Sequence, residues 1–184
     1  MYCYTKYTKR PIAQFLLLFI VLSVSFSSLR ASHIVGGEMT YRYIGDSTVS
    51  YNPRITWPRY EVTLVIYQDC TNGQPEAMAQ DNPAFFGVYN SAPPYVFIRA
   101  DSVHYATSEP IKGVHNTPCG SASTNYCLLK KTFKMKYVLN PASGYVITYS
   151  RCCRNAQVSN LVNSATLGST YYCTIPSTKN NSAV

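Results

Sequence analysis

Cysteine is the residue type in this chain with the widest chemistry, since a thiolate can bind zinc, act as a nucleophile or oxidise to a disulfide. Cys3 lies near the start, and six cysteines follow much later: Cys70, Cys119, Cys127, Cys152, Cys153 and Cys173. Zinc sites usually draw on short clusters such as C-x-x-C, whereas these cysteines are mostly far apart and the histidines, His33, His104 and His115, are scattered. The spacing favours disulfides, and we predict no metal site.

The remaining polar residues show no catalytic or ion-binding set. Ile34-Val35-Gly36-Gly37 matches the mature N-terminus of trypsin-like proteases, and Gly45-Asp46-Ser47 looks like the start of their nucleophile motif. Thr48 and Val49 follow the serine where that motif needs two glycines, so the match fails. The aspartates do not form a D-x-D-x-D calcium loop, although an incidental ion in a loop stays open. We predict a protein that is not an enzyme and has no cofactor.

The first thirty residues have the pattern of an export signal. Basic residues, among them Lys6 and Arg10, precede an apolar run from Phe15 to Val24. Ten helical residues reach about 15 Å, which is half of a bilayer core of about 30 Å, so we expect no stable membrane span. The alternative, an N-terminal core helix, would need an amphipathic pattern that is lacking. We expect cleavage after Ala31, giving a signal peptide over 1–31 that engages the export machinery.

Charge changes once that leader is removed. The chain contains 16 basic and 8 acidic residues, and four of the basic ones lie in the leader, so the mature chain carries +4. This excess favours solubility and weak attraction to acidic polymers, and it argues against dedicated nucleic-acid binding.

Apolar residues alternate with polar ones in three segments, which indicates β-strands. These segments are Arg59–Tyr67, Thr132–Leu139 and Tyr145–Cys153. Shorter candidates are Ile34–Tyr43, Phe85–Tyr89, Tyr95–Ala100 and Tyr171–Ile175. With 17 tyrosines, 11 prolines and weak helical signals, the pattern predicts an all-β protein, an antiparallel β-sandwich of Greek-key or jelly-roll type stabilised by disulfides. We place this domain at 32–176, followed by a polar, linker-like tail at 177–184.

Two long stretches are expected to be loops between these strands. One runs from Cys70 to Phe85 and has room for one helical turn, and the other runs from Asp101 to Thr124. Long loops on a rigid scaffold often carry binding sites, but they also serve as simple connectors. Both interpretations stay open.

The adjacent cysteines limit the possible disulfides. Consecutive strand residues point to opposite faces, so Cys152 and Cys153 should reach different partners. Cys119 and Cys127 bracket a short polar loop that suits a local bridge, which leaves Cys70 and Cys173 for the adjacent pair. Six thiols allow fifteen pairings, so this set is a hypothesis.

Lysines recur at alternate positions of one predicted strand. Lys130, Lys134 and Lys136 would form a positive stripe on its exposed face. This stripe could contact an acidic surface polysaccharide. It could equally be a solvated strand face whose charges discourage aggregation.

Four segments together resemble a family of exported proteins. They are Ala31–Tyr41 (A-S-H-I-V-G-G-E-M-T-Y), Tyr60–Cys70 (Y-E-V-T-L-V-I-Y-Q-D-C), Gly144–Asn155 (G-Y-V-I-T-Y-S-R-C-C-R-N) and Gly168–Pro176. Their combination resembles the N-terminal β-rich domain of gliding motility-associated or PKD-domain surface proteins, which gliding Gram-negative bacteria export through the type IX secretion pathway. Gln68 stands where the family usually has arginine, and Cys173 stands where it has another residue.

The resemblance implies a secreted or cell-surface adhesion module that belongs to a longer protein and contacts surface polysaccharide or other surface proteins. It implies no catalytic residues. Because the family's C-terminal sorting domain does not follow, a chain complete at Val184 would be expected in the periplasm. The second function that we weigh is a carbohydrate-binding module that uses the loops around Gln74–Pro83 and Asp101–Thr124, with exposed tyrosines as stacking platforms.

Overall fold

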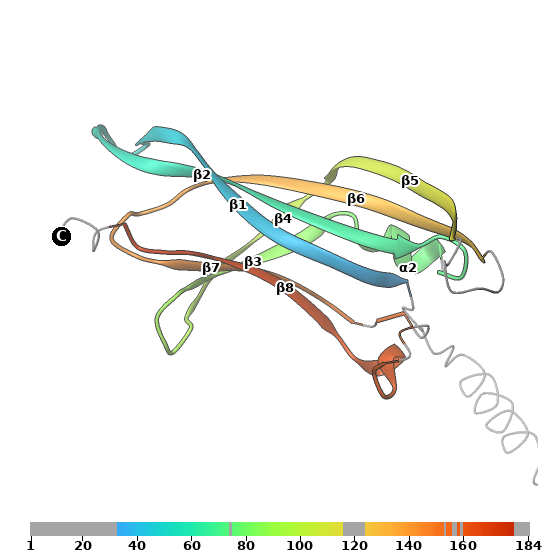
Figure 1. The fold of residues 1–184 in the computed structure, drawn as a ribbon. Coiled ribbons are helices and arrows are strands. Elements are labelled where there is room, and N and C mark those ends of the chain that lie inside the picture. The colour runs from blue at the N-terminus through green and yellow to red at the C-terminus, as the bar shows by residue number, and fades with distance from the viewer. Residues whose placement is uncertain are drawn as a thin grey trace, which may run out of the picture. The chain divides into compact units, whose positions relative to one another are not determined.

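Two antiparallel sheets pack face to face in the computed structural model, which describes residues 33–73, 75–115, 124–152, 154–155, 158 and 160–178 (Figure 1). Sheet A has the strand order β1-β2-β6-β5, and sheet B has the order β4-β3-β7-β8. The elements are β1 (Ile34–Val49), β2 (Asn52–Asp69), α2 (Pro75–Ala79), β3 (Ala84–Asn90), β4 (Phe97–Val103), β5 (Tyr105–His115), β6 (Thr124–Val138), β7 (Tyr145–Arg151), the 3-10 turn η1 (Ser164–Thr166) and β8 (Ser169–Ile175). The predicted antiparallel β-sandwich is confirmed.

Alternating side chains build the core between the sheets, as the period-two pattern predicts. On β2, Val62, Leu64 and Ile66 are fully buried. From the other sheet, Phe86 and Ile147 meet them in the same hydrophobic cluster. Burying such side chains contributes about 1.5–3 kcal/mol each. The inward positions of the central strands therefore hold the two sheets together.

The stretch from Asp101 to Thr124 is mostly strand, which corrects the loop prediction. β4 runs on to Val103, and β5 pairs with β6 along its length, with Tyr105 opposite Phe133. β5 forms the edge of sheet A and is largely exposed, so it has no alternating apolar pattern. Its Pro110 and charged residues are typical of edge strands, which must avoid pairing with other chains. The helical turn expected between Cys70 and Phe85 is present as α2.

Strand β7 is shorter than the alternation suggested. It ends at Arg151, so Cys152 lies beyond the sheet and Cys153 lies outside the described residues. Because β7 ends at Arg151, strand geometry gives no reason to expect different partners for Cys152 and Cys153, which corrects that prediction. In the part of the chain that the structure describes, no helix is both long and apolar enough to cross a bilayer.

Candidate functional site

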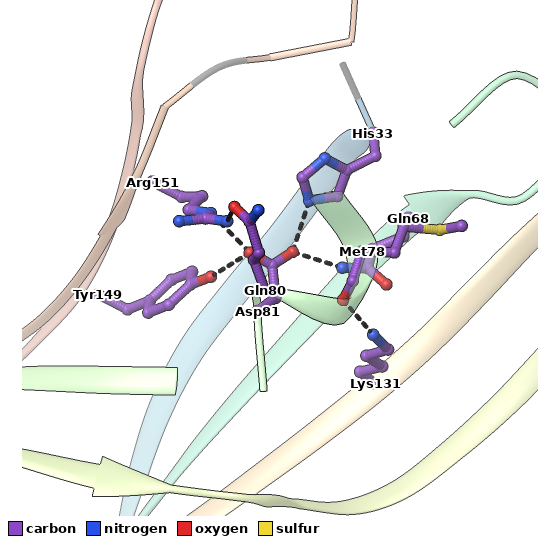
Figure 2. Close-up of polar contacts among 8 residues, drawn as sticks. All are labelled: His33, Gln68, Met78, Gln80, Asp81, Lys131, Tyr149 and Arg151. Atoms are coloured by element: carbon purple, nitrogen blue, oxygen red, sulfur yellow. Dashed lines mark hydrogen bonds and ion pairs between the residues drawn. The ribbon is translucent and has the colours of Figure 1, made fainter. Parts of the chain in front are cut away.

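A buried carboxylate, Asp81, organises one end of the sandwich (Figure 2). It follows α2, and neither of its oxygens reaches solvent. Oδ2 lies 2.5 Å from His33 Nε2 and accepts a hydrogen bond of 2.5 Å from Gln68 Nε2. Oδ1 lies 2.6 Å from Arg151 Nε and accepts a hydrogen bond of 3.3 Å from Tyr149 Oη. One side chain thus ties together the start of β1, the end of β2 and the end of β7.

Electrostatics around Asp81 follow from its burial. Burial raises the pKa of Tyr149, and the Asp81 charge raises it further because ionisation would place two anions together. Burial lowers the pKa of Lys131, while the attraction of Asp81 acts in the opposite direction. Lys131 Nζ donates to the Met78 carbonyl at 2.9 Å and so anchors α2 from β6. The cluster therefore places the negative charge of Asp81 near two positive charges, those of Arg151 and Lys131.

This network has the residue types of a catalytic site but not its accessibility. His33, Gln68 and Asp81 are each 0% exposed, and both Asp81 oxygens are already engaged. A catalytic acid or base must reach the proton that it transfers. We therefore interpret the cluster as a structural lock that holds the loop around α2 against the sheets.

A second carboxylate, Asp69, closes the end of β2. It accepts backbone hydrogen bonds from Thr71 at 2.8 Å and Asn72 at 3.0 Å, and a side-chain bond of 2.8 Å from Asn155. Burial raises the pKa of Asp69, but these hydrogen bonds outweigh burial and lower it overall. The turn after β2 and the segment after β7 are joined through this one side chain.

Cysteine pairing differs from the predicted set. Cys70 bonds Cys127, with a Cα–Cα distance of 5.2 Å, so the predicted Cys119–Cys127 bridge is wrong. β2 and β6 run antiparallel with Asp69 opposite Leu128, so Cys70, which directly follows β2, lies beside Cys127 of β6. The sequence alone could not show which strands are neighbours.

The other cysteines divide into three cases. Cys173 is a free thiol in the core, where burial raises its pKa to about 11, so its predicted role as a disulfide partner is wrong. It occupies an inward position of β8, opposite Ile147. Cys152 is disulfide-bonded. Cys119 and Cys153 lie outside the described residues.

The three lysines of the predicted stripe do share one face of β6. Lys134 and Lys136 are exposed, and Lys130 is half-buried. Two carboxylates stand beside them in register: Glu61 opposite Lys136 and Glu109 opposite Lys130. Glu61 also pairs with Arg42 at 2.9 Å. The outer face of sheet A is therefore a mixed-charge surface, and its contact with an acidic polymer stays a prediction.

The outer face of sheet B has a different chemistry. The strand registers place hydroxyl, aromatic and small side chains on it and no charged ones. These residues are Phe85, Gly87, Tyr89, Phe97, Ala100, Ser102, Val146, Thr148, Ser150, Thr170, Tyr172 and Thr174. The charged residues Arg99 and Asp101 of β4 pair with each other and stand opposite the inward positions Val88 and Phe86.

A groove of about 510 Å³ crosses this uncharged face, and we call it the tyrosine groove. It is lined by Tyr89, Tyr95, Val146, Thr148, Tyr172 and Thr174. Tyr172 and Tyr95 are 65% and 62% exposed. Such a volume lies in the range of small-molecule sites, roughly 300–1,000 Å³.

Gly87 makes room for one ring of the groove, Tyr89. A Cβ on Gly87 would stand 2.9 Å from Tyr89 Cε2, which is too close, and 3.0 Å from Thr148 Oγ1, which is tight. The Tyr89 ring therefore extends over the glycine and along the sheet. It also meets Phe97 edge to face, with ring centroids 5.4 Å apart. The absence of a side chain at Gly87 therefore allows Tyr89 and Thr148 to lie close together in the groove.

Tyr89 and Tyr172 lie on a sheet face and Tyr95 lies in the turn before β4, whereas the predicted stacking platform was beside two loops. One of those loops contains α2 and the Asp81 lock, with residue 74 outside the described residues. The other is largely β4 and β5, and its residues 116–123 lie outside the described residues. The available signal was the alternation Phe85-x-Gly87-x-Tyr89, whose small central residue stands between two outward rings.

One feature of the sequence pointed to the buried Asp81 cluster, namely a polar residue at an inward strand position. Val62, Leu64, Ile66 and Gln68 occupy successive inward positions of β2, and the last is polar. A polar residue at an inward position needs buried partners. Asp81, at the centre of the cluster, is separated by 13 residues from Gln68 and by 48 from His33, so the sequence could announce a cluster but not its members.

Comparison of the chain with protein-family models, with curated proteins and with solved structures finds no match. The resemblance to gliding motility-associated surface proteins therefore stays a prediction. What the structure itself defines is a disulfide-linked β-sandwich whose described strands form a charged outer face on sheet A and an uncharged one on sheet B.

Proposed function

We propose that the protein is a non-enzymatic, exported module that binds at a cell surface, of the adhesion type found in the gliding motility-associated proteins that it resembles. The observation that carries this proposal is a difference in solvent exposure between the Asp81 cluster and the tyrosine groove. The polar groups that cluster as those of a catalytic site would are buried and engaged around Asp81. The aromatic and hydroxyl groups of the tyrosine groove face solvent.

Export is supported by the cysteine chemistry. The Cys70–Cys127 bridge joins two strands of sheet A, and disulfides of this kind persist mainly in oxidising compartments. The predicted signal peptide would deliver the chain to such a compartment. There the bridge stabilises a domain that meets other molecules through its sheet faces.

A cell-binding assay tests the adhesion function. Purified, fluorescently labelled protein is added to intact Gram-negative gliding cells over a range of concentrations, and retained fluorescence is measured after washing. We expect saturable binding that excess unlabelled protein removes. Binding that rises linearly and resists competition, or no binding, would overturn the proposal.

A second measurement addresses export. The full chain is expressed in a Gram-negative host, and its compartment and the state of Cys70 and Cys127 are determined by fractionation and non-reducing peptide mapping. We expect an oxidised protein without its leader outside the cytoplasm. A reduced cytosolic protein that retains Met1 would contradict export.

A further inference from the structure

We propose that the tyrosine groove binds an uncharged polysaccharide, an inference that rests on the proposed binding function and gives it a ligand class. The groove lining combines three phenol rings with the hydroxyls of Thr148 and Thr174. A sugar ring has an apolar C–H face that packs on an aromatic ring and hydroxyls at its rim that need hydrogen-bond partners. The groove supplies both kinds of contact side by side.

Charge selects a neutral ligand. Recognition of a carboxylate, sulfate or phosphate group usually employs arginine or lysine, which form charge-assisted hydrogen bonds. The described strands of sheet B present no such residue on their outer face. The exposed lysines Lys134 and Lys136 lie on sheet A, across the core. An acidic polymer would therefore gain no charge-assisted hydrogen bond from the described strands around the groove, and the lysines of sheet A would attract it instead.

The placement of the rings suits an extended chain. Thr148 of β7 is in register with Gly87 on one side and Tyr172 on the other. Tyr89 comes from β3, and Tyr95 comes from the turn before β4. The rings thus flank a central strand and belong to separate segments. A polymer lying across the sheet would meet more than one of them.

A protein partner fits this face less well. Hydroxyl groups at its margin, such as Ser150 and Thr170, bond each other at 3.0 Å in an exposed position. Only one O–H donates in this pair, so a dry protein–protein contact would leave the other O–H donor without an acceptor, which disfavours association. Sugar hydroxyls can instead replace the water that these groups lose. The test also includes a measurement that detects binding of a second copy of this chain at the groove.

Affinity electrophoresis with soluble polysaccharides tests the proposal. The full-length protein, purified after expression, runs through gels containing mixed-linkage β-glucan, xylan or mannan as neutral probes and alginate as an anionic probe. The groove variants are Tyr172→Ala and Tyr95→Ala. The matched control is Tyr51→Ala, a tyrosine that is 69% exposed at the β1–β2 turn, outside the groove. Unchanged melting temperatures verify that each variant folds.

We expect at least one neutral polysaccharide to retard the protein, with the dissociation constant rising tenfold or more in Tyr172→Ala and staying unchanged in Tyr51→Ala. Retardation by alginate alone, or by no probe, would overturn the proposal. Equal retardation of the groove and control variants would overturn it as well. A dimer seen by sedimentation that Tyr172→Ala abolishes would assign the groove to a second copy of the chain instead.

The cell-binding assay separates this inference from the proposed function. If Tyr172→Ala and the unsubstituted protein bind cells equally, the groove assignment fails while the adhesion function stands. If the unsubstituted protein binds no cells, the adhesion function fails whatever the gels show.

Discussion

Removing the buried carboxylate of Asp81 should cost more stability than any other single acidic substitution in the described chain. Asp81→Ala takes away the acceptor for His33 and Gln68 and the counter-charge for Arg151. Breaking a buried ion pair by deleting one partner typically costs about 3–5 kcal/mol. The Arg151 side chain is 27% exposed, so water will partly solvate its freed charge. We therefore expect a loss of about 3–4 kcal/mol, at the lower end of that range and not a sum over all contacts.

Urea unfolding followed by tyrosine and tryptophan fluorescence measures this loss. Domains of ordinary stability have about 5–15 kcal/mol to lose, so the variant should still fold, with a much lower midpoint and an unchanged slope. Asp81→Asn keeps the size of the side chain but removes its charge, and we expect it to recover only part of the stability.

Asp46→Asn provides the matched control. Asp46 accepts one exposed hydrogen bond of 2.9 Å from Tyr43 Oη, so its substitution should change stability by less than about 0.5 kcal/mol. If Asp81→Ala cost less than about 1 kcal/mol, which is the size of an average substitution, the description of Asp81 as the lock at this end of the sandwich would be refuted.

Three further outcomes follow from the structure. Replacing Cys70 and Cys127 together by serine opens a loop with a sequence separation of 57, and chain entropy predicts a loss of about 4 kcal/mol in a urea titration; a loss below about 1 kcal/mol would contradict this. Asp69 has a lowered folded pKa, so its contribution is present above its unfolded pKa near 3.8 and disappears as the pH falls through the folded value. Asp69→Asn should therefore flatten the acid limb of a stability-against-pH curve, and an unchanged limb would argue against these hydrogen bonds. The Cys173 thiol, with a pKa of about 11 in the core, should resist iodoacetamide at about pH 8 in the native protein and react in urea, as peptide mapping can show; rapid native labelling would place it at the surface.

Strands with one buried face could be predicted from the sequence, because such strands need an apolar residue at every second position. The strand Arg59–Tyr67 lies within β2, and its inward positions are those that the alternation marked. β5 was missed because an edge strand exposed along most of its length imposes no apolar period. Its backbone hydrogen bonds to β6 depend on the partner strand and leave no pattern in the side chains.

The candidate groove was predictable in its chemistry and not in its position. Exposed tyrosines were expected, but their association depends on the order β4-β3-β7-β8, which places residues 89, 148 and 172 in one neighbourhood. No local rule relates residues from such distant parts of the chain.

The sequence by itself determined that the chain forms a β-sandwich, because period-two hydrophobicity and turn residues are local properties of the chain. Tertiary structure alone decided that Cys70 bonds Cys127, that Asp81 gathers four partners and that the described strands of sheet B have no charged residue on their outer face. Each of these depends on which strands are neighbours and in what register. That choice is made by the packing of the whole core, where each strand gains its stability only from the strands that it meets.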